Sequence, residues 1–451
     1  MIVYFHIDEL NRDAITASAL KKRFKDCGHR LVYGNRLTFS LLKYFHRIFD
    51  VIIIPRPHFL YDHFKDKWLL WNSKFVTLSN ESIGVITNDK ELIVKNLFEK
   101  EYFENTKKYV DKIDAFCLWG KKQLEAIKEH APEIYHKSYL VGHPRYDNFC
   151  LKYSHFNYDK LSNKNRIGII TRAVSLNEYY GRPALEFFKG YFNENYQYEY
   201  YNVMSQKKLL VKRPTIKETS VYQSIDAFNT INIIKYFINK KYKISIRVHP
   251  KENLDTWIKI IGKFDKQISF DITNQPITNW LQDIDYVIGP PSTVFYDALI
   301  SNVTPISISE LDPRRKLFIP ELAEDNNSLM PHIFKPKNIE EIFEFINKNK
   351  KIEITQEVQE IFHKEAGFPD CKDSLKNIVK VCEEVFKGNA SQKIKIHFIN
   401  FYLFIQIIHS FAWNIKSFFT KRKLHSAMFS LDFKTIKYID RLHIRKVSEL
   451  N

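Results

Sequence analysis

A histidine stands where an apolar run gives way to polar residues in the second half of the chain. Ile244 to Val248 is short, and three of its five residues are apolar, which predicts a buried strand; His249-Pro250 follows it directly. In open parallel sheets, ligands bind outside the carboxyl ends of the strands. His249 can donate a hydrogen bond to an anionic oxygen such as that of a phosphate, and Pro250 fixes the backbone there. A histidine that only caps the strand end is the alternative.

A second loop of this kind occurs further along the same half of the chain. The apolar run Tyr286 to Ile288 enters a loop, Gly289 to Thr293, with the sequence Gly-Pro-Pro-Ser-Thr, and a helical pattern follows. Ser292 or Thr293 is suited to cap that helix, whose first N–H groups attract anions. An ordinary helix cap is the alternative. Because both loops follow strands of one expected domain, together they predict an anion site.

Three cationic side chains accompany these loops. Arg172 follows the first apolar run of this half, Ile167 to Ile170, while Arg247 and Lys251 flank His249. Each can stabilise negative charge that develops on a phosphate. A solvated surface charge is the alternative for each of them.

We expect neither a metal nor a cofactor. Asp283 and Asp285 form an Asp-x-Asp sequence, but it precedes its strand and so lies away from the carboxyl-end crevice. The chain has no Gly-x-x-x-x-Gly-Lys-Ser/Thr sequence, and its 5 cysteines contain no Cys-x-x-Cys pair. The cysteines therefore predict reduced thiols in the cytoplasm rather than a disulfide framework or a zinc site.

The elements that would position these loops form two series of short apolar runs that alternate with amphipathic stretches. Such alternation predicts βαβ units around parallel sheets. Strands are expected first at Ile2–Phe5, Arg30–Tyr33, Val51–Ile54, Phe75–Leu78, Ala115–Trp119 and Ser138–Val141, and later at Ile167–Ile170, Ile244–Val248, Ile268–Ile272, Tyr286–Ile288 and Thr304–Ile308. Helices are expected at Ala14–Asp26, Lys121–Glu129, Ile225–Asn239, Tyr296–Ser301, Ile339–Asn347 and Gln356–Phe386.

Length and composition agree with two α/β domains. A chain of 451 residues that is 44% apolar can form two ordinary cores. The expected order is a Rossmann-like domain at 1–150, a linker at 151–165, a second Rossmann-like domain at 166–350, closing helices at 351–390 and a basic tail at 391–451. The formal net charge of +17 favours an anionic partner. The first residues lack the pattern of a signal peptide, which again favours the cytoplasm.

Several short motifs carry a resemblance to known proteins. The pair His249-Pro250, the Ser/Thr loop and an acidic residue in the first domain resemble the bacterial GT-B sialyl-, polysialyl- and Kdo transferases that use CMP-activated sugars. Over 1–309 the chain looks more like the bacterial surface carbohydrate biosynthesis proteins of capsule and O-antigen loci. That similarity is carried by Asn11-Arg12-Asp13, Gly28-His29, Asn80-Glu81-Ser82-Ile83-Gly84, Trp119-Gly120 and Gly142-His143-Pro144-Arg145-Tyr146-Asp147.

The resemblance implies a GT-B fold, in which two Rossmann-like domains face a cleft, and a metal-independent transferase. His249, Ser292 and Thr293 would contact the phosphate of the CMP donor. An attacking hydroxyl must lose its proton, and Glu81 would accept it as general base. The family often has a carboxylate pair before a glycine, whereas Asn80 precedes Glu81 here.

Further residues of the first domain would serve the acceptor. Asp13 is a second candidate for the general base, with a helix cap as its alternative. Arg12, His143 and Arg145 would line the acceptor side of the cleft. A tight loop joining the domains is the alternative for His143 and Arg145.

The tail has a pattern of its own. Between Lys395 and Lys416 no residue is charged. One helical face would carry Phe401, Tyr402, Ile405, Ile408, Ile415 and Phe419, and another Asn400, Gln406, Ser410, Asn414, Ser417 and Lys421. This stripe predicts an amphipathic helix that lies on an anionic membrane surface, with Lys416, Lys421, Arg422 and Lys423 near the lipid. A membrane-spanning helix and a helix packed on the protein or in a dimer are the alternatives.

The expected function is transfer of a nonulosonic or Kdo-type acid (sialic, pseudaminic or legionaminic acid, or Kdo) from a CMP-sugar to a lipid-linked capsular or O-antigen glycan. The enzyme would be cytoplasmic and peripheral on the inner face of the cytoplasmic membrane. A CDP-glycerol or CDP-ribitol phosphotransferase of teichoic-acid type is the nearest alternative. The charge also suggests a nucleic-acid-binding protein, but the basic residues are scattered and no such motif occurs, so we expect no nucleic-acid partner.

Overall fold

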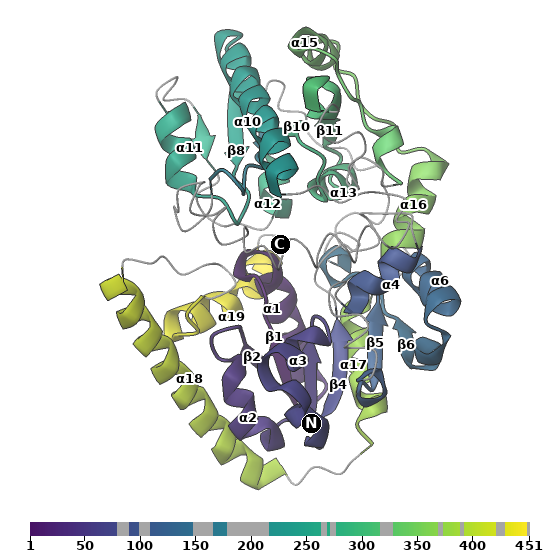
Figure 1. Ribbon diagram of the computed structural model, residues 1–451, viewed down its shortest axis with the longest axis vertical. Coiled ribbons are helices and arrows are strands. Elements are labelled where there is room, and N and C mark those ends of the chain that lie inside the picture. The colour runs from purple at the N-terminus through teal and green to yellow at the C-terminus, as the bar shows by residue number, and fades with distance from the viewer. Residues whose placement is uncertain are drawn as a thin grey trace. The chain divides into compact units, whose positions relative to one another are not determined.

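The computed structural model describes residues 1–78, 90–98, 109–147, 166–177, 216–262, 268–270, 277–315, 328–368, 373–387, 392–420 and 429–448 (Figure 1). Glu81, the predicted linker 151–165 and the side chain of Arg12 lie outside this description. Two compact units make up the chain. Unit 1 comprises Met1–Gly84, Lys90–Leu151 and Phe362–Asn451, and unit 2 comprises Val85–Asp89 and Lys152–Ile361.

Unit 1 contains a parallel sheet whose strands have the order β2-β1-β3-β4-β5-β6. The strands are β1 (Ile2–His6), β2 (Arg30–Gly34), β3 (Val51–Ile54), β4 (Lys74–Leu78), β5 (Ala115–Leu118) and β6 (Ser138–Leu140). All six predicted strands are confirmed, because short apolar runs between polar loops are typical of the strands of a parallel sheet. The helices of this unit are α1 (Leu10–Asp26), α2 (Leu42–Phe45), α3 (His58–Phe64), α4 (Lys90–Phe98), α6 (Lys121–His130), α17 (Ser374–Val385), α18 (Gln392–Thr420) and α19 (Phe433–Ser448).

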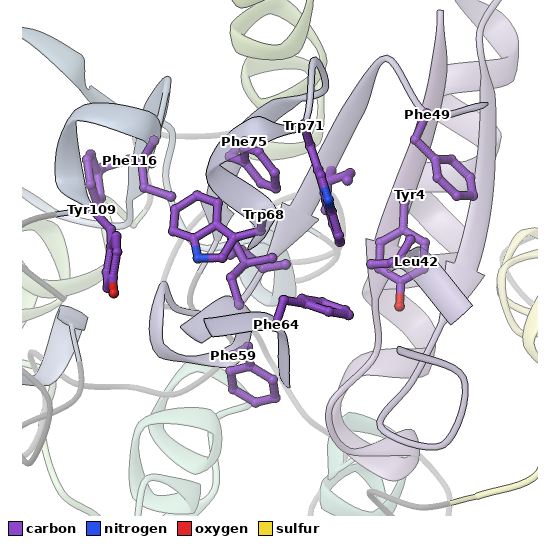
Figure 2. Close-up of a cluster of buried hydrophobic side chains, with 14 of the residues drawn as sticks. Tyr4, Leu42, Phe49, Phe59, Phe64, Trp68, Trp71, Phe75, Tyr109 and Phe116 are labelled. Carbon is purple, nitrogen blue, oxygen red and sulfur yellow. The ribbon is translucent and has the colours of Figure 1, made fainter. Parts of the chain in front are cut away.

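Side chains that alternate along each strand supply two separate cores. Ile2 and Tyr4 of β1 point into an aromatic cluster that includes Trp68 and Phe75 (Figure 2). Val3 and Phe5 point to the opposite face, where they meet α1, α17 and α19. The sheet is therefore covered on both sides, as a parallel sheet requires.

The end of α1 shows how local sequence fixes the edge of the sheet. Gly28 occupies the C′ position, with a positive φ of 75° just after the C-cap residue Cys27. The N–H of Gly28 donates to Lys25 O at 2.9 Å and that of His29 to Phe24 O at 2.7 Å. These are the two bonds of a Schellman motif, which turns the chain directly into β2.

Unit 2 contains a second parallel sheet, with the strand order β11-β10-β7-β8-β9. Its strands are β7 (Arg166–Ile170), β8 (Lys243–Arg247), β9 (Ser269–Phe270), β10 (Tyr286–Gly289) and β11 (Thr304–Ser307). Its helices are α10 (Ile216–Asn239), α11 (Leu254–Ile261), α12 (Ile277–Gln282), α13 (Val294–Ile300) and α15 (Ile339–Asn347), and α16 (Gln356–Ala366) continues into unit 1. The predicted architecture of two α/β units with parallel sheets is confirmed.

The predicted tail is docked on unit 1 by its polar side chains. In α18, Gln406 donates from Nε2 to the carbonyl of Tyr33 at 2.9 Å, and the hydroxyl of Ser410 accepts the N–H of Leu431 at 3.2 Å. Ile399 and Tyr402 are fully buried in the aromatic core. The helix lies beside the sheet of unit 1, with α19 against α1 (Figure 1). His397–Phe419 is long and apolar enough to cross a membrane, and 22% of that window is buried in the protein.

Candidate anion-binding site

The carboxyl edge of the sheet in unit 2 has a topological switch point. From β7 the chain proceeds outward through β8 to β9 and then returns to the other side of β7 as β10. The loops that follow β7 and β10 therefore leave the sheet in opposite directions, which opens a crevice between them in doubly wound folds. The loops predicted to bind an anion follow β8 and β10, on either side of β7.

Arg172 connects the loop after β7 to the loop after β10. Its Nη1 donates to the carbonyl of Pro291 at 3.3 Å, and its Nη2 donates to the hydroxyl of Tyr222 at 3.3 Å. Its guanidinium also lies over the ring of Tyr222, 5.7 Å from the centroid. At Gly289 a Cβ atom would collide with the side chain and carbonyl of Ile170, so only glycine allows β10 to end this close to β7.

His249 is attached to the same loop from the other side. Its backbone N–H donates to the hydroxyl of Thr171 at 3.1 Å, and its ring Nδ1 accepts the backbone N–H of Lys251 at 3.2 Å. A neutral imidazole whose Nδ1 accepts a hydrogen bond carries its proton on Nε2. The backbone thus selects the tautomer in which Nε2 is the donor, on a side chain that is partly exposed to solvent.

Glu252 holds these two loops together, and sequence reasoning missed it. Its carboxylate is 3% exposed and accepts the N–H of Ala173 at 2.7 Å, the hydroxyl of Thr171 at 3.0 Å and the indole N–H of Trp257 at 2.6 Å. Burial raises the pKa of Glu252 to about 7, although the three donors and nearby Arg172 favour the ionised form. The signal in the sequence was an acidic residue three positions after His249, followed five positions later by Trp257.

The remaining predicted residues of unit 2 have modest contacts. The hydroxyl of Ser292 accepts the N–H of Val294 at 3.2 Å, whereas Thr293 occupies the N-cap position of α13 without a side-chain cap. Ser292 therefore has the capping role that we assigned to either residue. Pro250 and Lys251 are exposed, and Arg247 is partly buried at the end of β8.

His143 and Arg145, predicted on the acceptor side, lie in a packed corner of unit 1. The ring of His143 is 7% exposed and stacks on Trp119 with their centroids 3.8 Å apart. The ring Nδ1 of His143 accepts the backbone N–H of Arg145 at 3.2 Å. The backbone N–H of His143 donates to the carbonyl of Ala366 at 3.3 Å. These contacts give the His143 ring a packing role in unit 1, and the place of both residues on the acceptor side stays a prediction.

Asp147 fastens the returning chain to this corner. Its carboxylate accepts the N–H and the hydroxyl of Ser374 and the N–H of Leu375, so it caps α17 from outside the helix. Burial raises the pKa of Asp147 to about 6. The motif Gly142 to Asp147 thus joins the end of the sheet in unit 1 to the C-terminal helices.

Replacing Asp147 by Asn is expected to change how stability depends on pH. The carboxyl has a pKa of about 6 in the folded protein and about 4 in the unfolded chain. Its contribution to the free energy of unfolding is complete below about pH 4 and falls by about 3 kcal/mol as the pH rises through 6. Urea denaturation of both proteins should show the wild type losing stability relative to Asp147→Asn between about pH 4 and 7. A constant difference would contradict this assignment.

The switch point of unit 1 lies between β1 and β3. The carboxylate of Asp13 accepts the N–H groups of Asp8 and Glu9, at 3.1 and 2.9 Å, and so fixes the loop after β1. The helix cap itself is Glu9 rather than Asp13. Asp8 pairs with Arg36 at 2.9 Å, and sequence reasoning overlooked both. Glu81, our first candidate for the base, is beyond the residues described after β4.

Comparison with known proteins finds no matching family model and no matching curated protein. The fold is similar to that of the wall teichoic acid polymerase TagF, with 12% identity and a TM-score of 0.44 over 85% of this chain and 89% of that chain. It is also similar to S. aureus MnaA with UDP (11%, 0.45, 86% and 99%) and to Anabaena HepE with UDP and glucose (7%, 0.35, 86% and 95%). Identities and scores this low carry no information about activity.

Proposed function

We propose that the chain is a glycosyltransferase that moves a nonulosonic or Kdo-type acid from a CMP-activated donor to a growing, lipid-linked surface glycan. One observation carries the proposal. The predicted loops leave the carboxyl ends of β8 and β10, on either side of β7, and the hydrogen bonds of Thr171 and Arg172 join both to the loop after β7.

The hydrogen-bond donors and the cation at these loops suit a phosphate that gains negative charge as its bond to the sugar breaks. Transfer of the sugar leaves CMP with a second negative charge on its phosphate, so donors aimed at that oxygen lower the barrier. Nε2 of His249 supplies a neutral donor and Arg172 a fixed cation. Ser292 and Thr293 would add hydroxyl groups from the facing loop. No step in this scheme requires proton transfer to the leaving group.

Unit 1 would bind the acceptor and supply the general base. We keep Glu81 as the proposed base, because in sequence it comes three residues after Leu78, the last residue of β4, and catalytic groups of α/β proteins gather where strands end. Asp13 is less suited, since its carboxylate already accepts two backbone N–H groups. Asp8 and its partner Arg36 at the same edge are candidates for contact with the acceptor.

Release of CMP tests the proposal. The wild type is expected to hydrolyse or transfer one of CMP-Kdo, CMP-sialic, CMP-pseudaminic or CMP-legionaminic acid, and His249→Ala should lower that rate about a hundredfold. His332→Ala, which changes a partly exposed histidine of the same unit, should leave the rate unchanged.

The same assay separates the alternatives. CDP-glycerol and CDP-ribitol are supplied in parallel, and their consumption would favour a phosphotransferase instead. If no donor gives release above the His249→Ala background, the proposed function is wrong.

A further inference from the structure

The helix α18 buries both apolar and polar side chains against the protein, and it presents a row of large apolar side chains to solvent. Seven of its exposed apolar residues share one face at helical spacing: Phe398, Phe401, Phe404, Ile408, Phe411, Ile415 and Phe418. The opposite face holds Ile399 and Tyr402, which are buried in the core, together with Gln406, which donates to the carbonyl of Tyr33, and Ser410, which accepts the N–H of Leu431. Helices on globular proteins normally bury their apolar face, so this orientation marks a surface that is covered by something else.

A groove with cationic and apolar walls lies beside this face. Its volume is about 280 Å³ and it runs between α1, β2, α18 and α19. The cationic wall consists of Lys21, Lys25, His29 and Arg30, and the apolar wall includes Leu403, Ile407, Phe433 and Ile436. In the part of the chain that is described, Lys21 pairs with Asp440 and His29 with Glu383, while no carboxylate pairs with Lys25 or Arg30.

The sequence of the C-terminal segment that contributes α18 and α19 is strongly basic. Between residues 392 and 448 the only acidic residues are Asp432 and Asp440. The basic residues of that segment are Lys393, Lys395, Lys416, Lys421, Arg422, Lys423, Lys434, Lys437, Arg441, Arg445 and Lys446. Outward aromatic side chains on a segment with this excess of positive charge suit binding to an anionic lipid bilayer.

We propose that the outward face of α18 and the adjoining groove form a seat for an anionic phospholipid bilayer. The helix lies in the interface, its phenylalanines enter the acyl layer, and Lys25 and Arg30 contact a lipid phosphate. Because Ile399 and Tyr402 are buried in the core and Gln406 donates to the carbonyl of Tyr33, the helix binds the bilayer without leaving the protein. This proposal is independent of the transfer reaction.

Vesicle flotation tests the seat with the full chain. We expect the wild type to float with vesicles of phosphatidylglycerol and phosphatidylcholine in equal parts, and Phe401→Ser/Phe411→Ser to bind them about tenfold more weakly. Both phenylalanines are exposed, at 53% and 63%, so circular dichroism should show an unchanged fold. Phe228→Ser, at a similarly exposed aromatic of α10 in unit 2, is the matched control and should bind like the wild type.

A charge reversal separates the headgroup contact from the apolar contact. Lys25→Glu should weaken binding to the mixed vesicles several-fold and leave binding to pure phosphatidylcholine unchanged, whereas Lys350→Glu in unit 2 should change neither. Undiminished flotation of the double phenylalanine variant would overturn the proposal. It would also be overturned if the wild type were a stable dimer that this variant dissociates, because a second copy would then cover the face.

Discussion

Glu252→Ala should destabilise unit 2 by about 3 kcal/mol or more and reduce CMP release about a hundredfold. The truncation leaves the N–H of Ala173, the indole N–H of Trp257 and the hydroxyl of Thr171 without their acceptor in a buried site. Because Thr171 in turn accepts the N–H of His249, the loop that carries the proposed phosphate donor loses its support. Urea denaturation and the CMP-release assay measure the two effects.

Two further variants identify the cause. Glu252→Gln retains one carbonyl acceptor but places an amide against a donor, so it should fall between the wild type and Glu252→Ala. Glu344→Ala removes an exposed carboxylate of the same unit and should behave like the wild type. If Glu252→Ala unfolds at the wild-type urea concentration and remains fully active, Glu252 does not position the site.

Gly120→Ala should loosen the attachment of the C-terminal helices to unit 1. A methyl group at this position would overlap the backbone of Lys364 and Glu365, which cannot give way as a flexible side chain can. The buried ion pair between Lys122 and Glu365, 2.6 Å long, would separate as that segment moves. We expect a loss of about 3 kcal/mol in the free energy of unfolding and faster cleavage by trypsin near the start of α17.

Gly28→Ala is the matched control for this substitution. Its added methyl would have no atom within 4 Å, so only the positive φ of 75° opposes it. That strain should cost about 1 kcal/mol and leave the trypsin pattern unchanged. Equal destabilisation by the two variants would show that the contact with Lys364 and Glu365 is unimportant.

The strands were predictable because their signal is local. Val51–Ile54 begins and ends where we expected, since an uninterrupted β-branched run between polar residues is stable only inside a parallel sheet. The helix Ile339–Asn347 was equally clear, because Asn338 caps its first turn and its apolar residues repeat at helical spacing. The long helix α10 begins nine residues before the predicted Ile225. The prediction started too late because the first turns of the helix lack apolar residues at helical spacing.

Contacts between distant segments were not predictable in this way. Glu252 follows Lys251 in a polar stretch and so resembles a solvated residue, yet Trp257 and the loop after β7 bury it. His143 resembles His249 in sequence, but Trp119 covers its ring. For α18, periodicity separated an apolar from a polar face. It could not show that Gln406 would donate to the carbonyl of Tyr33, or that Tyr402 of the apolar stripe would be buried in the core while Phe401 stays exposed.

The path of the chain through the two units constrains its synthesis on the ribosome. Unit 1 needs α17, whose Ile378 and Cys382 fill the core against α1, and α17 is encoded after all of unit 2. The N-terminal strands therefore leave the ribosome before the side chains of α17 that complete their core, although domains made first generally fold first. Unit 2 can complete its sheet earlier, and a nascent chain stalled before residue 374 would hold a folded second half beside a vulnerable first half that chaperones would need to shield.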